Sequence, residues 1–374
     1  MSRRNVRNCG QVKGQVIGLL QQTLNTSGCS RRLSTDLLLR VIVGIGLLKA
    51  TITAVSQRVA LGVSDETLRK AIYAALPPMW MFPELFDKQL QGWIKKAQRR
   101  KRGVIIAIDL HHQPYYGKPQ KGLFRGKAKQ GTKKFWSIAT ACVVERGEKL
   151  TLAMAPVYNN RMEDTLDALW PQLQSKGIRI RRLLLDRGFY SADVIDWLQS
   201  RNVPFLMPMI CRGKKPSKNS PGTGTAQFMA PGRRGFTTHT WKKRRSKLQV
   251  TVQVAIVPNP KTKQKTPLLY AYHGRLPNLT YCRELYRKRF GIETSYRESR
   301  HCRAWTTTRK ENWRRFLQIL SFILANAWAL LTLGQQKKPW RERLTQQHFQ
   351  QQLIELLDLP TTQVLTQEPS VAIT

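Results

Sequence analysis

The spacing of apolar and polar residues divides the chain into stretches with different secondary structure. Up to about residue 100 the apolar positions recur with the period of a helix, as in Leu37–Leu48 and Asp65–Leu76. From Gly103 to about residue 211, short runs of β-branched and apolar residues are separated by turn residues, which predicts strands. Beyond residue 211 the chain turns to Pro, Gly, Ser and basic residues before strands and helices resume. The pattern therefore predicts a helical N-terminal region followed by an α/β region.

Two short helices near the N-terminus have the arrangement of a DNA-binding motif. The segment Ile52–Ile72 has Gly62 where a turn between two helices would fall, and Ser64 can cap the second helix. The segment thus resembles a helix-turn-helix. Any two packed helices joined through a glycine give the same pattern, so a purely structural pair fits it equally well.

The middle of the chain predicts a mixed sheet flanked by helices. In chain order, the expected elements are the strands Val104–Leu110, Phe135–Val144 and Leu150–Val157, the helix Met162–Trp170, the strand Ile180–Leu185, the helix Ser191–Gln199 and the strand Phe205–Met209. Three strands, a helix, a strand, a helix and a strand is the element order of the ribonuclease H-like fold, an α/β architecture. We therefore expect a domain of that fold here.

The remainder of the chain adds a β-rich insertion and further helices. After a basic loop at Arg212–Gly235, the pattern predicts strands at Phe236–Trp241, Leu248–Val257 and Leu268–His273, and helices at Tyr281–Arg300 and Phe316–Leu333. We expect a helical DNA-binding region at 1–100, a catalytic domain in two parts at 101–211 and 276–334, a β-rich insertion at 212–275, and a tail at 335–374 with an amphipathic piece at Phe349–Leu357.

The charge of the chain indicates a polyanionic partner. The chain carries 64 Lys and Arg against 22 Asp and Glu, a formal net charge of +42. Self-repulsion of this size, spread along the chain, is typical of proteins that bind nucleic acid. A structural basic protein, such as a ribosome-associated one, is the alternative, but such proteins are usually shorter and poorer in Trp.

Membrane binding and export are not expected. No basic amphipathic helix or lipidation signal is visible, and the N-terminal residues lack the apolar stretch of a signal peptide. The apolar segment Phe316–Leu333 is interrupted by polar residues and is expected to be a buried helix that covers a sheet. The six cysteines are scattered without a Cys-x-x-Cys pair, which fits the reducing cytoplasm, where the protein would associate with the nucleoid.

Two Asp residues stand at the ends of predicted strands. Asp109 lies near the end of one apolar strand, and Asp186 ends the run RRLLLD. A single Asp in such a position often caps the next helix, but two on neighbouring strands would meet at one edge of the sheet. Paired carboxylates would repel a polyanionic substrate unless divalent ions lay between them, and oxygen ligands select Mg²⁺ or Mn²⁺. We therefore predict a two-metal site.

The predicted helix Tyr281–Arg300 offers a third carboxylate, Glu293. Residues separated by three, four and seven positions share one helix face, and this spacing joins Tyr286, Arg289, Glu293 and Arg300. A carboxylate flanked by two cations and a phenol can hold metal and phosphate together. For this helix taken alone, a solvated face with salt bridges is the alternative.

These residues resemble the DDE transposases of bacterial insertion sequences, in the group marked by Tyr, two residues, Arg, three residues, Glu, six residues and Lys. Tyr286, Arg289 and Glu293 match that spacing, and Arg300 stands at the Lys position, where a planar guanidinium replaces a point charge. The resemblance spans about residues 100–330 and includes the strand with Asp109, the residues 186–189, and the β-rich insertion.

The resemblance implies an activity and a set of partners. Asp109 would bridge two metal ions, Asp186 would hold one and Glu293 the other, while Tyr286, Arg289, Arg300 and Arg187 would contact DNA. The substrate would be the terminal inverted repeats of the protein's own mobile element, cut by a homodimer on paired ends and joined to target DNA. A structure-specific nuclease of the same fold and a non-catalytic DNA-binding descendant of a transposase are the alternatives. The insertion and the helix signature argue against the first, and the presence of all three carboxylates argues against the second.

Three further residues could contact the substrate. Trp241 in the insertion precedes the basic run Lys242–Arg245 and could stack on an unpaired base, the role that a Trp in this insertion has in the family it resembles, or it could pack a small core. His111 and His112 follow Asp109, but no Cys or Glu stands at metal-ligand spacing from them, so we expect substrate or backbone contacts rather than metal ligation.

Overall fold

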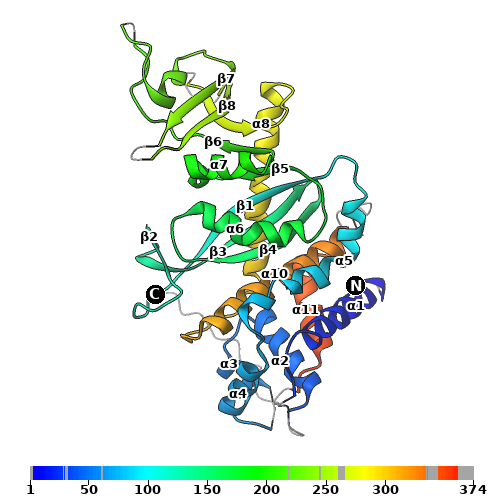
Figure 1. Ribbon diagram of the computed structural model, residues 1–374. Helices are drawn as coiled ribbons and strands as arrows, with labels where there is room; N and C mark the ends of the chain where they lie inside the picture. Colours follow the sequence, from blue (N-terminus) through cyan, green and yellow to red (C-terminus); the bar gives the residue numbers. More distant parts are fainter. Residues whose placement is uncertain are drawn as a thin grey trace, which may run out of the picture. The chain divides into compact units, whose positions relative to one another are not determined.

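The protein folds into two compact units. The structure is a computed structural model, and it describes residues 3–27, 29, 33–59, 62–217, 219–243, 246–259, 266–333, 335 and 344–360. One unit combines Met1–Gln89 with Arg297–Thr374 and is helical, and the other, Leu90–Tyr296, is built around a sheet (Figure 1). The helices α5 (Glu84–Gln98) and α9 (Gly291–Arg300) run across the boundaries between the units. The expected α/β class, with a mixed sheet flanked by helices, is confirmed.

Within the described residues the sheet has nine strands, and its middle matches the predicted order. The strands are β1 (Val104–Pro114), β2 (Phe124–Lys129), β3 (Thr132–Glu145), β4 (Glu148–Val157), β5 (Ile180–Leu185), β6 (Phe205–Pro208), β7 (Gly235–Lys242), β8 (Gln249–Val257) and β9 (Leu268–His273). They are ordered β2-β3-β1-β5-β6-β9-β8-β7, with β4 paired to β3. The strand β2 was not expected, because its largely polar, exposed sequence lacks the alternation of a half-buried strand.

The strands of the insertion extend the central sheet and do not form a separate one. β6 pairs antiparallel with β9, and β8 joins β9 to β7. Arg182 of β5 is buried where these strands meet, and its guanidinium donates to the carbonyl oxygens of Phe205 at 3.1 Å, His273 at 2.9 Å and Arg275 at 2.9 Å. One side chain thus ties the insertion to the strands whose order the sequence predicted.

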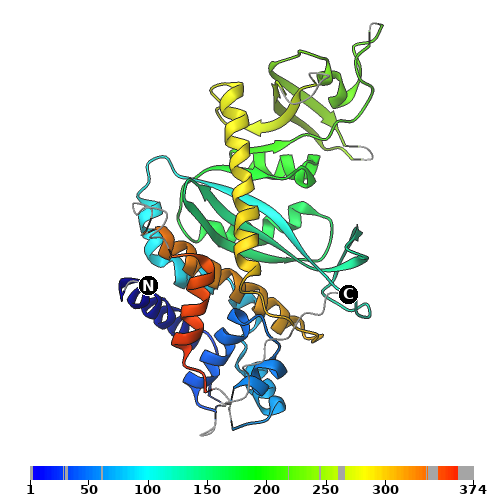
Figure 2. The same ribbon diagram turned by 180° about the vertical axis from the view of Figure 1, so that it is seen from behind.

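Helices cover both faces of the sheet. α6 (Met162–Gln174) packs on β3 and β4, and α7 (Ala192–Ser200) packs on β8. On the opposite face, α8 (Leu279–Arg287), the 3-10 turn η4 (Lys288–Phe290) and the first part of α9 follow one line across the strands (Figure 2). The predicted helix at 281–300 is therefore two α-helices joined by a 3-10 turn. Two other 3-10 turns, η2 (Arg187–Phe189) and η3 (Gly224–Met229), lie after β5 and in the basic loop.

The helical unit contains more helices than the pattern predicted. They are α1 (Arg3–Gln21), α2 (Thr35–Leu47), α3 (Ile52–Arg58), α4 (Asp65–Ala75), η1 (Met79–Met81), α10 (Glu311–Leu333) and α11 (Gln346–Leu357). The amphipathic piece expected near Phe349 is α11, and it packs against α1. In that contact the Cys9 thiol donates to Gln352 at 3.0 Å, and burial raises the pKa of Cys9 to about 11. The rest of the expected tail, 361–374, lies outside the described residues.

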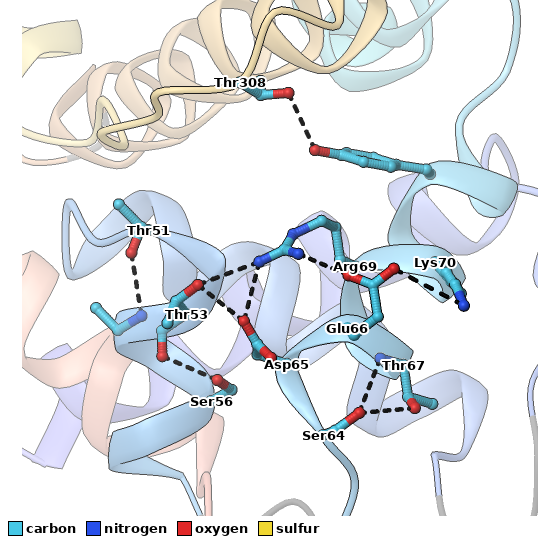
Figure 3. A network of polar contacts seen from close by, with 12 residues as sticks. Thr51, Thr53, Ser56, Ser64, Asp65, Glu66, Thr67, Arg69, Lys70 and Thr308 are labelled. Atoms are coloured by element: carbon cyan, nitrogen blue, oxygen red, sulfur yellow. Dashed lines mark hydrogen bonds and ion pairs between the residues drawn. The ribbon is translucent and has the colours of Figure 1, made fainter.

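The helices α3 and α4 form the predicted helical pair. The side chains of Thr51 and Ser64 cap them by accepting hydrogen bonds from the backbone N–H groups of Ala54 and Thr67, as expected for Ser64. The guanidinium of Arg69 reaches Asp65 at 2.9 Å, Glu66 at 2.7 Å and the Thr53 hydroxyl at 3.3 Å, so it links the two helices (Figure 3). The charged start of α4 is therefore neutralised by its own helix.

The helix α10 is buried, but its neighbours differ from those expected. Within the helical unit it packs against α1, α2 and η1. These neighbours are helices and not the sheet that the sequence analysis expected. Among the described helices it is long and apolar enough to cross a membrane, with a mean hydropathy of 1.9, and 72% of its most apolar stretch is buried. The helices α2 and α3 meet that criterion only when taken together, across a bend of 113°.

The two units do not follow the predicted domain boundaries. Residues 297–334, assigned from the sequence to the second part of the catalytic domain, group with the N-terminal helices. Residues 90–100, assigned to the helical region, group with the sheet. The roles assigned to these regions stay predictions.

Replacing Arg182 tests how firmly the insertion is joined to the sheet. Arg182→Met should lower the free energy of unfolding by about 3 kcal/mol, because it leaves three carbonyl oxygens without a charged donor. Arg181→Met is the control, since Arg181 makes a partly exposed pair with Glu145 at 3.1 Å and should cost less than about 1 kcal/mol. Urea unfolding of the full chain measures both, and equal losses would contradict the role given to Arg182.

Candidate active site

Asp109 and Asp186 lie side by side on adjacent parallel strands. The register of β1 and β5 pairs Ile108 with Leu185, so the two Asp residues occupy the next position on each strand. The structure thus brings together the two carboxylates that the sequence pattern placed at one sheet edge. Only β5 ends there, however, because β1 continues to Pro114 in pairing with β3, where Asp109 faces Thr140.

Two buried hydroxyl contacts fix the helix α9 on the sheet beneath Asp109. The Tyr296 hydroxyl lies 2.9 Å from the backbone oxygen of Asp109, to which it donates, and 2.8 Å from the Thr140 hydroxyl on β3. One residue earlier, the Ser295 hydroxyl lies 3.0 Å from that of Thr151 on β4. Because Glu293 is on the same turn of α9, these contacts set its distance from Asp109.

Arg289 lies between all three carboxylates. Its Nη1 is 3.1 Å from Asp109 Oδ2, and its Nη2 is 3.4 Å from Glu293 Oε1 and 3.7 Å from Asp186 Oδ1. The side chain of Arg289 is only 10% exposed, whereas those of Asp186 and Glu293 are 45% and 50% exposed. The guanidinium therefore points inward to the carboxylates, and this pairing was not foreseen when Arg289 was assigned to DNA.

The electrostatics of the site are dominated by burial of Asp109. Burial raises the pKa of Asp109, against the charge of Arg289 and the Leu110 backbone N–H, which donates to Asp109 Oδ1 at 2.8 Å. Burial acts to lower the pKa of Arg289, but the charges of Asp109, Tyr286 and Asp186 and the hydrogen bond to Asp109 together outweigh it, and the pKa is raised. A partly desolvated carboxylate held beside a second one attracts any cation that can reach it.

The three carboxylates fit a divalent metal site in their chemistry. All the donors are carboxylate oxygens, the ligands preferred by Mg²⁺ and Mn²⁺, and they converge on a single cationic group. Among the described residues, no group of three or more His, Cys, Asp or Glu side chains is spaced to hold a metal ion as they stand. The spacing around the guanidinium is wider than that of a metal site, so metal binding requires Arg289 to yield.

A cavity adjoins the carboxylates on the side of Asp186. It has a volume of about 590 Å³ and is lined in part by Asp186, Arg187, Tyr270 and Tyr286. Arg187 is exposed and Tyr286 half-buried, and burial raises the pKa of Tyr286, so its phenol stays protonated. A smaller cavity of about 400 Å³, lined by residues of α6 and Arg201, contains none of the three carboxylates. The larger cavity is therefore the one that could admit part of a substrate.

Trp241 packs beside the segment that follows Asp186. Its ring lies 5.1 Å from that of Tyr190 and 5.7 Å from that of His239, and it remains half-exposed. The Tyr190 ring is buried, and burial raises the pKa of its hydroxyl. Arg244 and Arg245, part of the basic run after Trp241, lie outside the described residues. Trp241 is thus packed against Tyr190 and His239 and stays partly exposed.

The two His residues after Asp109 have structural partners. His111 is buried, with its ring 4.9 Å from that of Tyr296. His112 Nδ1 lies 2.7 Å from the Ser137 hydroxyl, its ring stacks on Phe124, and burial lowers its pKa. Both rings thus pack against neighbouring strands and α9, and the expectation of substrate or backbone contacts for them stays a prediction.

The remaining predicted residue and the residues that were missed lie on α9. Arg300 is the exposed last residue of α9 and groups with the helical unit. Ser295 and Tyr296, which anchor the helix, were not predicted. The one available signal was spacing, since Tyr296 stands one turn after Glu293 and so faces the same layer of the sheet.

Comparisons with known proteins identify the family of the chain. Residues 91–328 match the family of the transposase DDE domain. No curated protein matches the chain. Seven chains of solved structures do, and one is a cryo-EM structure of a piggyBac transposase synaptic complex with hairpin DNA. It is similar over 93% of this chain and 77% of its own, with 11% sequence identity and a TM-score of 0.54, a likeness of fold. The chain belongs to the transposase DDE domain family.

Proposed function

We propose that this protein is a DNA transposase that cleaves and joins phosphodiester bonds at the ends of its own mobile element, with Asp109, Asp186 and Glu293 as its catalytic carboxylates. The observation that carries the proposal is the convergence of these three carboxylates on one cationic group beside a cavity. Family membership supports the general reaction. The Tyr286, Arg289 and Glu293 spacing supports the insertion-sequence group, with Arg300 in the Lys position.

The reaction would be an in-line displacement at phosphorus. In cleavage a water oxygen attacks the phosphate at the element end, and the P–O bond to the 3′-oxygen breaks and frees a 3′-hydroxyl. In strand transfer that hydroxyl attacks a target phosphate, a new phosphodiester forms, and the target strand's 3′-oxygen leaves. Two Mg²⁺ ions, which Mn²⁺ can replace, would when bound activate the attacking oxygen and stabilise the leaving one. Asp109 is the least exposed of the three carboxylates. Its side chain would therefore stay in place, and those of Asp186 and Glu293 would move toward the bound ions.

DNA is the proposed partner. The net charge of +42 supports it, as does the likeness to a transposase determined with hairpin DNA. Arg187 and Tyr286 line the cavity beside Asp186, where they would hold a phosphate. The partly exposed Trp241 would stack on an unpaired base. Arg300 would contact the backbone. We further propose a homodimer on paired terminal repeats, working in the cytoplasm on the nucleoid.

Neutralising each carboxylate tests the proposed reaction. Asp109→Asn, Asp186→Asn and Glu293→Gln should each reduce Mg²⁺-dependent cleavage by about a thousandfold or more while DNA binding persists, because only the charge that holds metal is removed. The assay is cutting of a fragment that carries the element's ends, with Mg²⁺ or EDTA, beside a gel-shift measurement of binding.

Glu284→Gln is the matched control for this experiment. Glu284 is an exposed carboxylate on α8, and its replacement should leave cleavage unchanged. Cutting by Glu293→Gln at the rate of the wild type would contradict the assignment of the triad. Nicks without strand transfer into a target would favour the structure-specific nuclease.

The buried hydroxyl of Tyr296 is proposed to position the site without touching the substrate. Tyr296→Phe should slow cleavage by about tenfold and lower the free energy of unfolding by about 1–2 kcal/mol, since it removes the bonds to Asp109 and Thr140. Thr140→Val should add little on top, because both replacements break the same contact. Cleavage rates and urea unfolding of the two single variants and the double variant measure this, and simple additivity would overturn it.

We propose that the exposed side of α4 contacts DNA through residues that follow the first turn of the helix, where the charges are already paired. Lys70 is 77% exposed and lies 3.8 Å from Glu66, while Lys88 of α5 is 38% exposed and 3.9 Å from Glu84. Lys70→Ala should weaken binding of the terminal repeat and lower the salt dependence of log Kd by about one, as for one lost phosphate contact. Lys88→Ala should change neither quantity. Equal effects in salt titrations would leave α3 and α4 as a structural pair.

A further inference from the structure

Arg289 and a divalent ion would be attracted to the same three carboxylates. The guanidinium reaches Asp109 Oδ2, Glu293 Oε1 and Asp186 Oδ1, one oxygen on each carboxylate. A divalent ion held by these groups would repel the guanidinium and would need their oxygens closer together than they lie around Arg289. Arg289 and a divalent ion would therefore compete for this cluster.

The distances between Arg289 and the three carboxylates indicate weak contacts, which the guanidinium can leave. Its distances of 3.1, 3.4 and 3.7 Å exceed the 2.7–2.9 Å usual for charge-assisted hydrogen bonds. In the same unit, Arg100 and Glu148 form two short bonds of 2.7 and 2.8 Å. The Nε of Arg289 is also buried without a hydrogen-bond partner. Arg289 also interacts with the phenol of Tyr286. Its guanidinium is therefore shared among several partners and makes no short bidentate pair with any of the three carboxylates.

We propose that Arg289 is an internal counter-ion that competes with divalent ions for the carboxylates of Asp109, Asp186 and Glu293, and that metal binding releases it. The inference rests on the proposed function, since it takes these carboxylates to be the metal ligands. It assigns to Arg289 a control over metal loading that is separate from any contact with DNA.

The released guanidinium couples metal binding to DNA binding. A buried Arg without an anion is unfavourable, so the side chain needs a new partner when it leaves the carboxylates. In a chain that binds DNA, a phosphate at the adjoining cavity supplies that partner. Coupling between two ligands is reciprocal, so DNA raises the affinity for metal by the same factor by which metal raises the affinity for DNA.

Mn²⁺ binding tests the competition without relying on catalysis. Free Mn²⁺ is measured by its EPR signal during titration of the full chain without DNA. Arg289→Gln should bind Mn²⁺ at least about tenfold more tightly than the wild type, because the competing cation is gone. Arg289→Lys should fall between them, since a point charge cannot reach three carboxylates at once. Lys288→Gln is the control, because it removes the neighbouring charge, which pairs with Glu145 at 3.5 Å, and it should match the wild type.

The outcomes separate this inference from the proposed function. If Asp109→Asn and Glu293→Gln bind Mn²⁺ as the wild type does, the carboxylates are not the ligands and the proposed function fails. If those two variants lose Mn²⁺ but Arg289→Gln binds it no more tightly than the wild type, the competition alone is overturned. A gain in Lys288→Gln equal to that in Arg289→Gln would also overturn it, because net charge would then explain the effect.

A measurement on the wild type covers the case in which the Arg289 variants do not fold. Phenylglyoxal modifies accessible guanidinium groups, and peptide mass spectrometry reports the rate at each Arg. Arg289, with 10% of its side chain exposed, should react slowly in EDTA and several times faster in saturating Mg²⁺. The exposed Arg187 and Arg300 serve as internal references. An unchanged or slower reaction of Arg289 in Mg²⁺ would contradict the release.

Discussion

Mutual repulsion of three carboxylates at one sheet edge is the constraint on which the sheet unit depends. The parallel register of β1 and β5 forces Asp109 and Asp186 to be neighbours, and α9 brings Glu293 to the same place. Like charges this close are tolerated only with a cation among them, and Arg289 supplies it from the preceding turn. The site is therefore built as a negative pocket around an exchangeable positive charge.

Hydrogen bonds between neutral groups position the site, whereas the groups proposed to act in it are charged. The hydroxyls of Ser295, Tyr296, Thr140 and Thr151 form a buried layer under the carboxylates, and their hydrogen bonds carry no net charge. Exchange of one cation for another above this layer need not disturb it. The backbone positions of the triad can thus persist while its side chains and charge balance change, which is the preorganisation that catalysis by fixed charges requires.

The sequence allowed the sheet to be predicted better than the contacts that surround it. Apolar runs gave the central strands, and an Asp near the end of each of two neighbouring runs gave the meeting of Asp109 with Asp186, because both follow from local patterns. The continuation of β1 to Pro114 was not predicted. The polar strand β2 and the helix partners of α10 depend on tertiary packing that periodicity does not record. The same holds for the hydroxyl layer, since Ser and Thr within strands carry no signal of their partners. The contact of Arg289 with the carboxylates was not predicted either. Helix spacing shows which residues share a face, but it does not show which anion a long side chain on that face contacts.

The continuity of the sheet through β6 and β9 has a consequence for the evolution of the insertion. β6 has only four residues and is flanked by β5 and β9. Loss of the insertion would turn β6 into an edge strand, with a free row of backbone donors and acceptors able to template pairing with other chains. The insertion therefore also acts as a protective cover against aggregation. A descendant without these strands would need another way to protect the edge of β6, such as a helix packed against it, a proline within it or a run of lysines along it.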